Sequence, residues 1–315
     1  MNDERTSSHP HYRHDVLIHD DDAALVSATR NFVGRGLEAG ADVLVHGTRG
    51  RIAMLEQALA AHPQLTYGYD EQMYLAPSQT LFEYQRQLAE RDPRARDLWV
   101  TGTVPLGATS AAQAAWSRYE SAVNEALGSF PFQAMCTYDT RTTPTAVIAA
   151  ARASHPGLNN GEGSVPCPDY RPPADFLAHP LAKVPQAPRE APQLATDVLG
   201  LDDLGSLRDL VRTTARSASA LPLDAIEDLL VAINEVIANG VIHGSPPVSV
   251  TVWVNLAEIV VQVVDNGHGG VHPLAGYRFP DFDGAVGLWV ARQEVDDLII
   301  DTPRDGGCRI LLIKS

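Results

Sequence analysis

The chain has 315 residues, of which 44% are hydrophobic, and a formal net charge of −15 at pH 7. This length fits two ordinary domains better than one, and the hydrophobic share is large enough to give each domain a core. The acidic charge argues against direct binding to nucleic acid, because the arginines are scattered among carboxylates and form no basic patch.

No run of about 18 apolar residues is present, so a membrane-spanning segment is not expected. The N-terminus is polar and contains no signal segment, so we expect a cytoplasmic protein. The cysteines Cys136, Cys167 and Cys308 are far apart and form no CxxC pair. They are therefore expected to be reduced thiols rather than disulfides or a zinc site.

The first half of the chain alternates between short apolar runs and helical patterns. Strands are expected at 16–18, 43–47, 98–101 and 132–136, and helices at about 20–40, 51–61, 79–90, 111–127 and 144–154. Asp20 to Asp22 can cap the first of these helices. The alternation predicts an α/β fold with a mostly parallel sheet that has helices on both faces.

Nine prolines between Pro156 and Pro192 interrupt this pattern. Proline lacks a backbone donor and resists both helices and central strands. We therefore expect an extended linker over 156–194, between domains at 10–155 and 195–315. A long ordered loop packed on one domain is the alternative.

Helices come first after this segment, at about 202–219 and 224–243, and strands follow at 248–254 and 259–264. A helix near 286–295 then leads to strands at 298–301 and 308–313. Helices on one side of a mixed sheet would form an α/β sandwich.

The helix at 224–243 carries a polar row opposite its apolar face. Glu235, Asn239 and His243 are spaced i, i+4, i+8, whereas Ile226, Leu230, Ile233, Ile237 and Val241 form the face that should be buried. Carboxylate and amide oxygens are hard ligands that suit magnesium or a general base beside it. A solvated polar face is the alternative interpretation.

Two glycine-containing segments follow. Asp265 ends a strand and precedes Gly267 and Gly269, and its carboxylate could accept a hydrogen bond from the amine of adenine. Asp-Asn-Gly is also an ordinary turn signal, which is the alternative interpretation. Residues 284–288, with Gly287 and Leu288, open the next helix, and a helix N-terminus favours phosphate. The intervening 270–283 would be a lid whose one cation is Arg278.

In this order and spacing, residues about 195–315 resemble the Bergerat-fold ATPases, and among them the anti-sigma-factor serine kinases. The resemblance implies that Glu235 is the catalytic base, that Asn239 holds Mg²⁺ and that Asp265 binds adenine. The expected ATP-binding residues are Asn239, His243, Asp265, Gly267, Gly269, Arg278, Gly287 and Leu288. The third glycine box departs from the family pattern, since Ala285 and Val286 replace a common glycine and arginine.

Residues about 10–155 resemble the MEDS sensory domain, which is related to RecA-like folds, through His14-Asp15-Val16-Leu17, Val100-Thr101-Gly102, Tyr119-Glu120-x3-Asn124 and Cys136-Thr137-Tyr138-Asp139. A possible small-molecule signal follows from this resemblance. Glu120 and Asn124 could line its pocket or satisfy one another.

Two other sites are conceivable in this domain. Gly47-Thr48-Arg49-Gly50 follows a strand but lacks the GKS or GKT ending of a phosphate loop, so a second ATP site is not expected. His9, His11, His14 and His19 could hold a metal, but we favour a frayed, histidine-rich terminus.

The resulting hypothesis is a signalling regulator: a sensor domain controls an ATP- and Mg-dependent serine/threonine kinase that phosphorylates an anti-sigma antagonist protein. Its expected partners are a sigma factor and that antagonist, and the resemblance also suggests a homodimer. The alternative is a non-catalytic ATP-binding module that sequesters a partner. A sensor histidine kinase is disfavoured, because no histidine occurs between His179 and His243.

Overall fold

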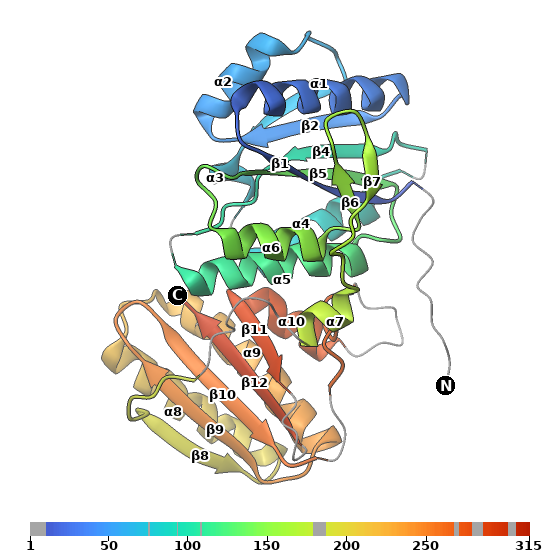
Figure 1. Ribbon diagram of the computed structural model, residues 1–315. Coiled ribbons are helices and arrows are strands. Elements are labelled where there is room, and N and C mark those ends of the chain that lie inside the picture. The colour runs from blue at the N-terminus through green and yellow to red at the C-terminus, as the bar shows by residue number, and fades with distance from the viewer. Residues whose placement is uncertain are drawn as a thin grey trace. The chain divides into compact units, whose positions relative to one another are not determined.

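The computed structural model describes residues 11–74, 76–92, 94–107, 109–178, 187–267, 271–278, 286–301 and 307–315. The chain divides into two compact units, one built mainly from the described residues up to 178 and the other from 187 onward (Figure 1). None of the helices within these ranges combines the length and the apolar character needed to cross a membrane.

The first unit is a seven-stranded sheet in the order β3-β2-β4-β5-β1-β6-β7, and every neighbouring pair is parallel except β6 and β7. Helices cover it on both faces, with α1 and α2 on one side and α4, α5 and α6 on the other (Figure 1). The predicted mostly parallel α/β fold is therefore confirmed. The strands are β1 (Arg13–His19), β2 (Asp42–Gly47), β3 (Leu65–Tyr69), β4 (Leu98–Gly102), β5 (Phe132–Asp139), β6 (Gly157–Asn159) and β7 (Ser164–Pro166). The helices are α1 (Asp22–Glu38), α2 (Arg49–Ala58), α3 (Asp70–Met73), α4 (Pro77–Glu90), α5 (Ser110–Ala126), α6 (Thr145–Ser154) and α7 (Pro173–Ala178).

Local sequence explains where the first helix begins. The Asp21 side chain accepts a hydrogen bond of 2.7 Å from the backbone N–H of Ala24, as an N-cap aspartate should. One face of α1 then buries Leu25, Phe32 and Val33 against β2 and Trp99. These apolar contacts hold α1 on the sheet, and the cap sets its start.

The proline-rich segment is partly folded, in contrast to the extended linker expected over 156–194. Its first part forms β6, which pairs with β1, then a turn in which Asn160 Oδ1 accepts hydrogen bonds from the N–H groups of Glu162 and Gly163, and then β7. Pro166 ends β7 at the sheet edge, where a missing N–H is tolerated. Residues 156–178 thus match the alternative of an ordered segment packed on one domain.

The second unit is a five-stranded sheet in the order β11-β12-β10-β9-β8. All its described pairings are antiparallel, so the expectation of a mixed sheet was wrong: β9 pairs with β10 and β11 with β12, each directly following in the chain, and β10 and β12 join the two pairs. The strands are β8 (Leu194–Val198), β9 (Val248–Val254), β10 (Ile259–Asp265), β11 (Asp297–Asp301) and β12 (Cys308–Lys314), and the helices are η1 (Leu201–Asp203), α8 (Leu204–Ala218), α9 (Leu223–His243) and α10 (Gly287–Glu294).

A single apolar core joins this sheet to its helices and confirms the α/β sandwich. The predicted buried face of α9 is inside it: Ile226, Leu230, Ile233 and Ile237 are at most 1% exposed. Burial of side chains of this size stabilises a fold by roughly 1.5–3 kcal/mol each. The same periodicity turns Glu235 and Asn239 away from the centre of the core.

Candidate functional site

The C-terminal half of α9 supplies the first part of the candidate ATP site. Glu235 and Asn239 are half-buried, one turn apart, and α10 begins directly beside them. A Cβ atom on Gly287 would lie 2.7 Å from Glu235 Oε2 and 3.2 Å from Asn239 Nδ2. Glycine therefore lets the backbone at the start of α10 approach these two side chains in their present positions, where a Cβ atom would displace the Glu235 carboxylate.

The end of β10 supplies the second part. Asp265 Oδ1 accepts a hydrogen bond of 2.8 Å from the N–H of Gly267, which fixes the carboxylate. Cβ atoms on Gly240 and Gly244 would lie 3.6 Å from Asp265 Cβ and 2.7 Å from Asp265 Cγ, respectively. Asp265 therefore packs against the last turn of α9, next to the turn that carries Asn239.

The predicted residues thus divide into three groups. Glu235, Asn239, Asp265, Gly267 and Gly287 come together around the C-terminal half of α9. His243 and Arg278 are exposed at the surface, and the Leu288 side chain is buried in the core, so only the backbone of Leu288 can face a ligand. Gly269, and Gly284 with Ala285, lie outside the described residues.

Part of the expected lid is anchored to α10. The Arg292 guanidinium lies 3.7 Å from the centre of the Tyr277 ring, and its Nε donates a hydrogen bond of 2.9 Å to the Ala275 carbonyl. Arg292 Nη1 also donates to the Leu298 carbonyl at 2.8 Å. Residues 271–278 and the strand after α10 are therefore held by one buried arginine, which the sequence analysis did not identify.

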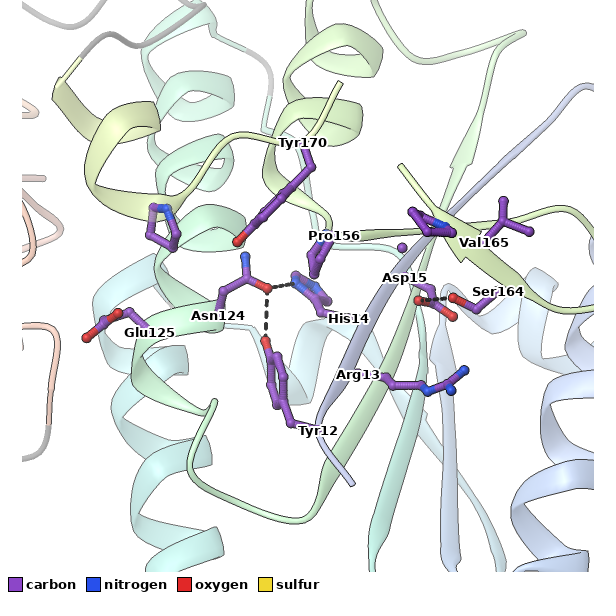
Figure 2. Close-up of a pocket in the computed structure, with 13 residues that line it drawn as sticks. Tyr12, Arg13, His14, Asp15, Asn124, Glu125, Pro156, Ser164, Val165 and Tyr170 are labelled. Carbon is purple, nitrogen blue, oxygen red and sulfur yellow. Dashed lines mark hydrogen bonds between the residues drawn. The ribbon is translucent and has the colours of Figure 1, made fainter. Parts of the chain in front are cut away.

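The sensory unit contains a separate cavity of about 510 Å³. Figure 2 shows Tyr12, His14 and Asn124 converging at its wall, with the Tyr12 hydroxyl donating to Asn124 Oδ1 at 3.0 Å. Asn124 therefore lines a pocket, as one interpretation held. Its side chain does not bond to the Glu120 carboxylate; Asn124 Nδ2 lies 3.4 Å from the Glu120 backbone carbonyl instead.

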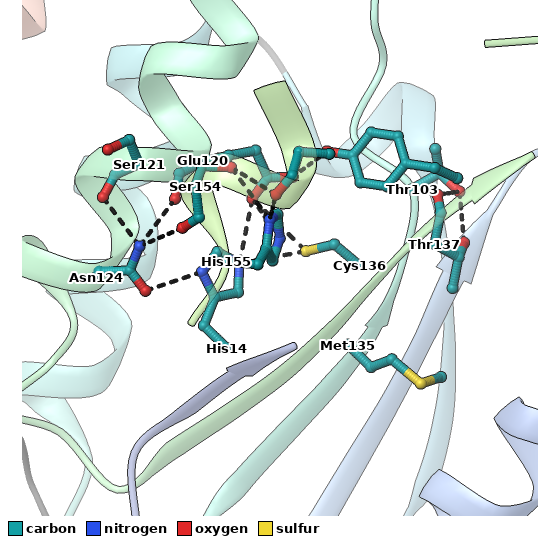
Figure 3. Close-up of polar contacts among 12 residues, drawn as sticks. His14, Thr103, Glu120, Ser121, Asn124, Met135, Cys136, Thr137, Ser154 and His155 are labelled. Carbon is teal, nitrogen blue, oxygen red and sulfur yellow. Dashed lines mark hydrogen bonds and ion pairs between the residues drawn. The ribbon is translucent and has the colours of Figure 1, made fainter. Parts of the chain in front are cut away.

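Glu120 turns toward Cys136, His14 and His155 (Figure 3). His14 and His19 are both buried on β1, so the expectation of a frayed terminus was wrong for these two residues. Neither histidine was identified from sequence as a partner of Glu120, because β1, α5 and α6 are far apart in the chain. Gly47 to Gly50 form an ordinary helix start, in which Thr48 Oγ1 accepts from the N–H of Arg51 at 3.4 Å.

Comparison with known proteins agrees with both units. Residues 13–156 match the family described as MEDS, "MEthanogen/methylotroph, DcmR Sensory domain", and residues 200–314 match the histidine kinase-like ATPase domain. Two proteins named "Anti-sigma F factor", from Clostridium botulinum strains Eklund 17B / Type B and Alaska E43 / Type E3, are each 26% identical over 105 residues. The alignment covers 30% of this chain and 73% of each relative.

Fold, site and matches together define a class: a signalling regulator in which a sensory domain is joined to an ATPase domain that is similar to two anti-sigma F factors. Within that class, the chain consists of a MEDS domain followed by a histidine kinase-like ATPase domain.

Proposed function

We propose that this protein is an ATP- and Mg-dependent serine/threonine kinase of the anti-sigma type. The observation that carries the proposal is the approach of Gly287 to Glu235 and Asn239, which sets the N-terminus of α10 beside a carboxylate and an amide. A phosphate at the N-terminus of that helix would then be next to both side chains.

The residues present fit a magnesium nucleotide. The space beside Gly287 is one that a Cβ atom would fill, and the neighbouring donors are a carboxylate and an amide oxygen, which suit Mg²⁺. Asn239 would hold the ion. Asp265 would accept a hydrogen bond from the adenine amine through Oδ2, since its Oδ1 already accepts a hydrogen bond from the N–H of Gly267. The ion, when bound, would neutralise charge on the phosphates.

Transfer requires a proton acceptor for the attacking hydroxyl. Glu235 would take the proton from a serine or threonine of the antagonist as the bond from that oxygen to the γ-phosphorus forms and the bond from the phosphorus to ADP breaks. The first N–H groups of α10 would orient the phosphates. No histidine of the protein itself is needed in this scheme.

Val286, the residue before Gly287 that departs from the family pattern, is compatible with phosphate binding at the start of α10. Val286 is 46% exposed, so its side chain faces solvent rather than the space between α9 and α10. The altered box therefore leaves the close approach of Gly287 intact, and this supports a kinase over a module that only holds ATP.

A sigma factor and a small antagonist are the partners that we propose, since the relatives are named as anti-sigma factors. We also propose a cytoplasmic homodimer, with the MEDS domain receiving a small-molecule signal.

Two assays on the full chain test the proposal: calorimetry with Mg and ATP, and transfer of labelled γ-phosphate to small antagonist proteins encoded beside its gene. Glu235→Gln should keep ATP binding and lower transfer by about 10²–10⁴-fold. Glu227→Gln, an identical change two turns earlier on α9, should have wild-type transfer. Tight ATP binding without any transfer would support the sequestering module instead, and phosphohistidine on the protein would support a histidine kinase.

A further inference from the structure

Four side chains with metal-ligating atoms meet inside the MEDS domain. His14 comes from β1, Glu120 from α5, Cys136 from β5, and His155 directly follows α6 (Figure 3). Their ligand atoms all lie within 4.8 Å of one another, and three of the four residues are buried. The cluster has no role in the proposed kinase chemistry.

The spacing of these atoms fits one ion. His14 Nε2 lies 3.2 Å from Glu120 Oε2 and 3.4 Å from Cys136 Sγ. Cys136 Sγ and His155 Nε2 lie 3.6 and 3.5 Å from the same carboxylate oxygen. Tetrahedral zinc bonds of ordinary length place ligand atoms about 3.3–3.6 Å apart.

Hydrogen bonds outside the cluster turn His14 toward it. Asn124 Nδ2 donates to the carbonyls of Ser154 at 2.7 Å and Ser121 at 3.2 Å, so the amide oxygen of Asn124 must face His14. His14 Nδ1 therefore carries the proton that this oxygen accepts at 3.1 Å. Its Nε2 points inward, the arrangement that outer partners impose on metal-binding histidines.

His155 is turned inward in the same way. Its Nδ1 donates to the Ala151 carbonyl at 2.7 Å, which leaves a lone pair on Nε2. This buried Nε2 has no hydrogen bond, and it faces the Glu120 carboxylate at 3.5 Å. A lone pair that faces a carboxylate in a buried site is unfavourable unless a proton or a metal cation lies between them.

Glu120 already has partners in this cluster. Tyr138 donates a hydrogen bond of 2.8 Å to Glu120 Oε1, and His14 Nε2 lies 3.2 Å from Glu120 Oε2. An ion pair between His14 and Glu120 would satisfy those two residues and leave the His155 lone pair unsatisfied.

We propose that His14, Glu120, Cys136 and His155 bind one divalent transition metal ion of the zinc class. Two imidazoles, a carboxylate and a thiolate are ligands that Zn²⁺ takes in tetrahedral sites. The carboxylate and the thiolate balance the charge of the ion, so no net charge is buried. The ion would displace the proton of the Cys136 thiol on binding.

A small cavity of about 30 Å³ borders His14, Glu120 and Cys136. The rings of Tyr74, Tyr84 and Tyr119 are among the residues that line it. The site therefore has space for roughly one or two water-sized molecules beside the ion.

The test uses the purified full chain, stripped with a chelator and titrated with Co²⁺, which reports thiolate ligation as a charge-transfer absorption band. We expect one cobalt per chain and a band that Zn²⁺ abolishes by competition. Cys136→Ser should lose the band, whereas Cys167→Ser, the matched change at the other cysteine of the first unit, should retain it. Asn124→Ala should keep the band and weaken metal affinity by about 10–100-fold, because Asn124 orients His14.

Wild-type protein that binds no stoichiometric cobalt or zinc would overturn the proposal without any variant, and so would an unchanged band in Cys136→Ser. Circular dichroism shows whether each variant is folded. None of these readouts depends on ATP or on phosphotransfer, so the metal site and the kinase hypothesis can fail separately.

Discussion

Replacing Gly287 by alanine tests whether the start of α10 and Glu235 form one site. The new methyl group would lie 2.7 Å from Glu235 Oε2, so the carboxylate must withdraw by about 0.7 Å to restore an ordinary contact of about 3.4 Å. Misplacing a catalytic group by about 1 Å can lower a rate by about 10²-fold. We therefore expect phosphotransfer to fall by roughly 30–100-fold.

The stability of Gly287→Ala should stay close to that of the wild type although its activity falls. The atom in conflict is the end of a flexible side chain, and alanine is favoured over glycine in a helix by up to about 1 kcal/mol. We expect the free energy of unfolding to change by less than about 1 kcal/mol, as measured by urea denaturation. Transfer is measured under saturating Mg and ATP, so that weaker nucleotide binding is separated from slower chemistry.

The matched control is Gly205→Ala in α8, where a Cβ atom would meet nothing within 4 Å. It should leave transfer unchanged and raise stability by about 0.5–1 kcal/mol. If folded Gly287→Ala transferred phosphate at the wild-type rate, the assignment of Glu235 as the base beside α10 would be refuted.

Three further predictions follow from particular contacts. Gly244→Ala should lower the free energy of unfolding in urea by about 1–3 kcal/mol, because its Cβ would lie 2.5 Å from the backbone oxygen of Gly240 and 2.7 Å from Asp265 Cγ; wild-type stability would contradict this close packing at the end of α9. Asp265→Asn should weaken ATP binding in calorimetry and reduce the preference for ATP over GTP, and an unchanged preference would remove Asp265 from the adenine site. Arg141 lowers the pKa of Asp139 from 3.8 to about 2, so the carboxylate stabilises the fold above about pH 4 and loses this effect as pH falls toward 2. The Tm deficit of Asp139→Asn should therefore be largest at neutral pH and vanish near pH 2; a deficit that does not depend on pH would show that the ion pair is not its cause.

Much of the ATPase domain was predictable because its signals are local. The 3.6-residue period of α9 separates Ile233 and Ile237, which are buried, from Glu235 and Asn239, and the same helix geometry puts both polar groups on one side. Asp265 could be assigned to the end of a strand because the apolar run directly before it is also a local signal. Their proximity to Gly287, however, depends on how α10 packs on α9, which no local pattern contains.

The elements that sequence analysis missed are short or lie at sheet edges. β3 contains Gly68, and β6 and β7 have three residues each, too few to show an alternating pattern. β8 follows the proline-rich segment and pairs only with β9 in the sheet order. Such strands are specified by their partners in the sheet rather than by their own residues.

The histidine–cysteine cluster could not be predicted for a different reason. Its ligands come from β1, α5, β5 and the residue after α6, so no fixed spacing marks them as it would in a CxxC motif. Only the parallel pairing of β1 with β5 brings His14 to Cys136. Asn124, the polar partner of His14, is equally distant in sequence, whereas His155 bonds to Ala151 only four residues before it.

The proline at the free margin of the MEDS sheet has a consequence for self-association. An outermost strand normally presents a row of unpaired amides onto which another chain can add, and this growth leads toward fibrils. β7 has only three residues, and Pro166 contributes no amide hydrogen. A strand from another molecule therefore finds almost no backbone donors to pair with at the β7 edge, even at high protein concentration.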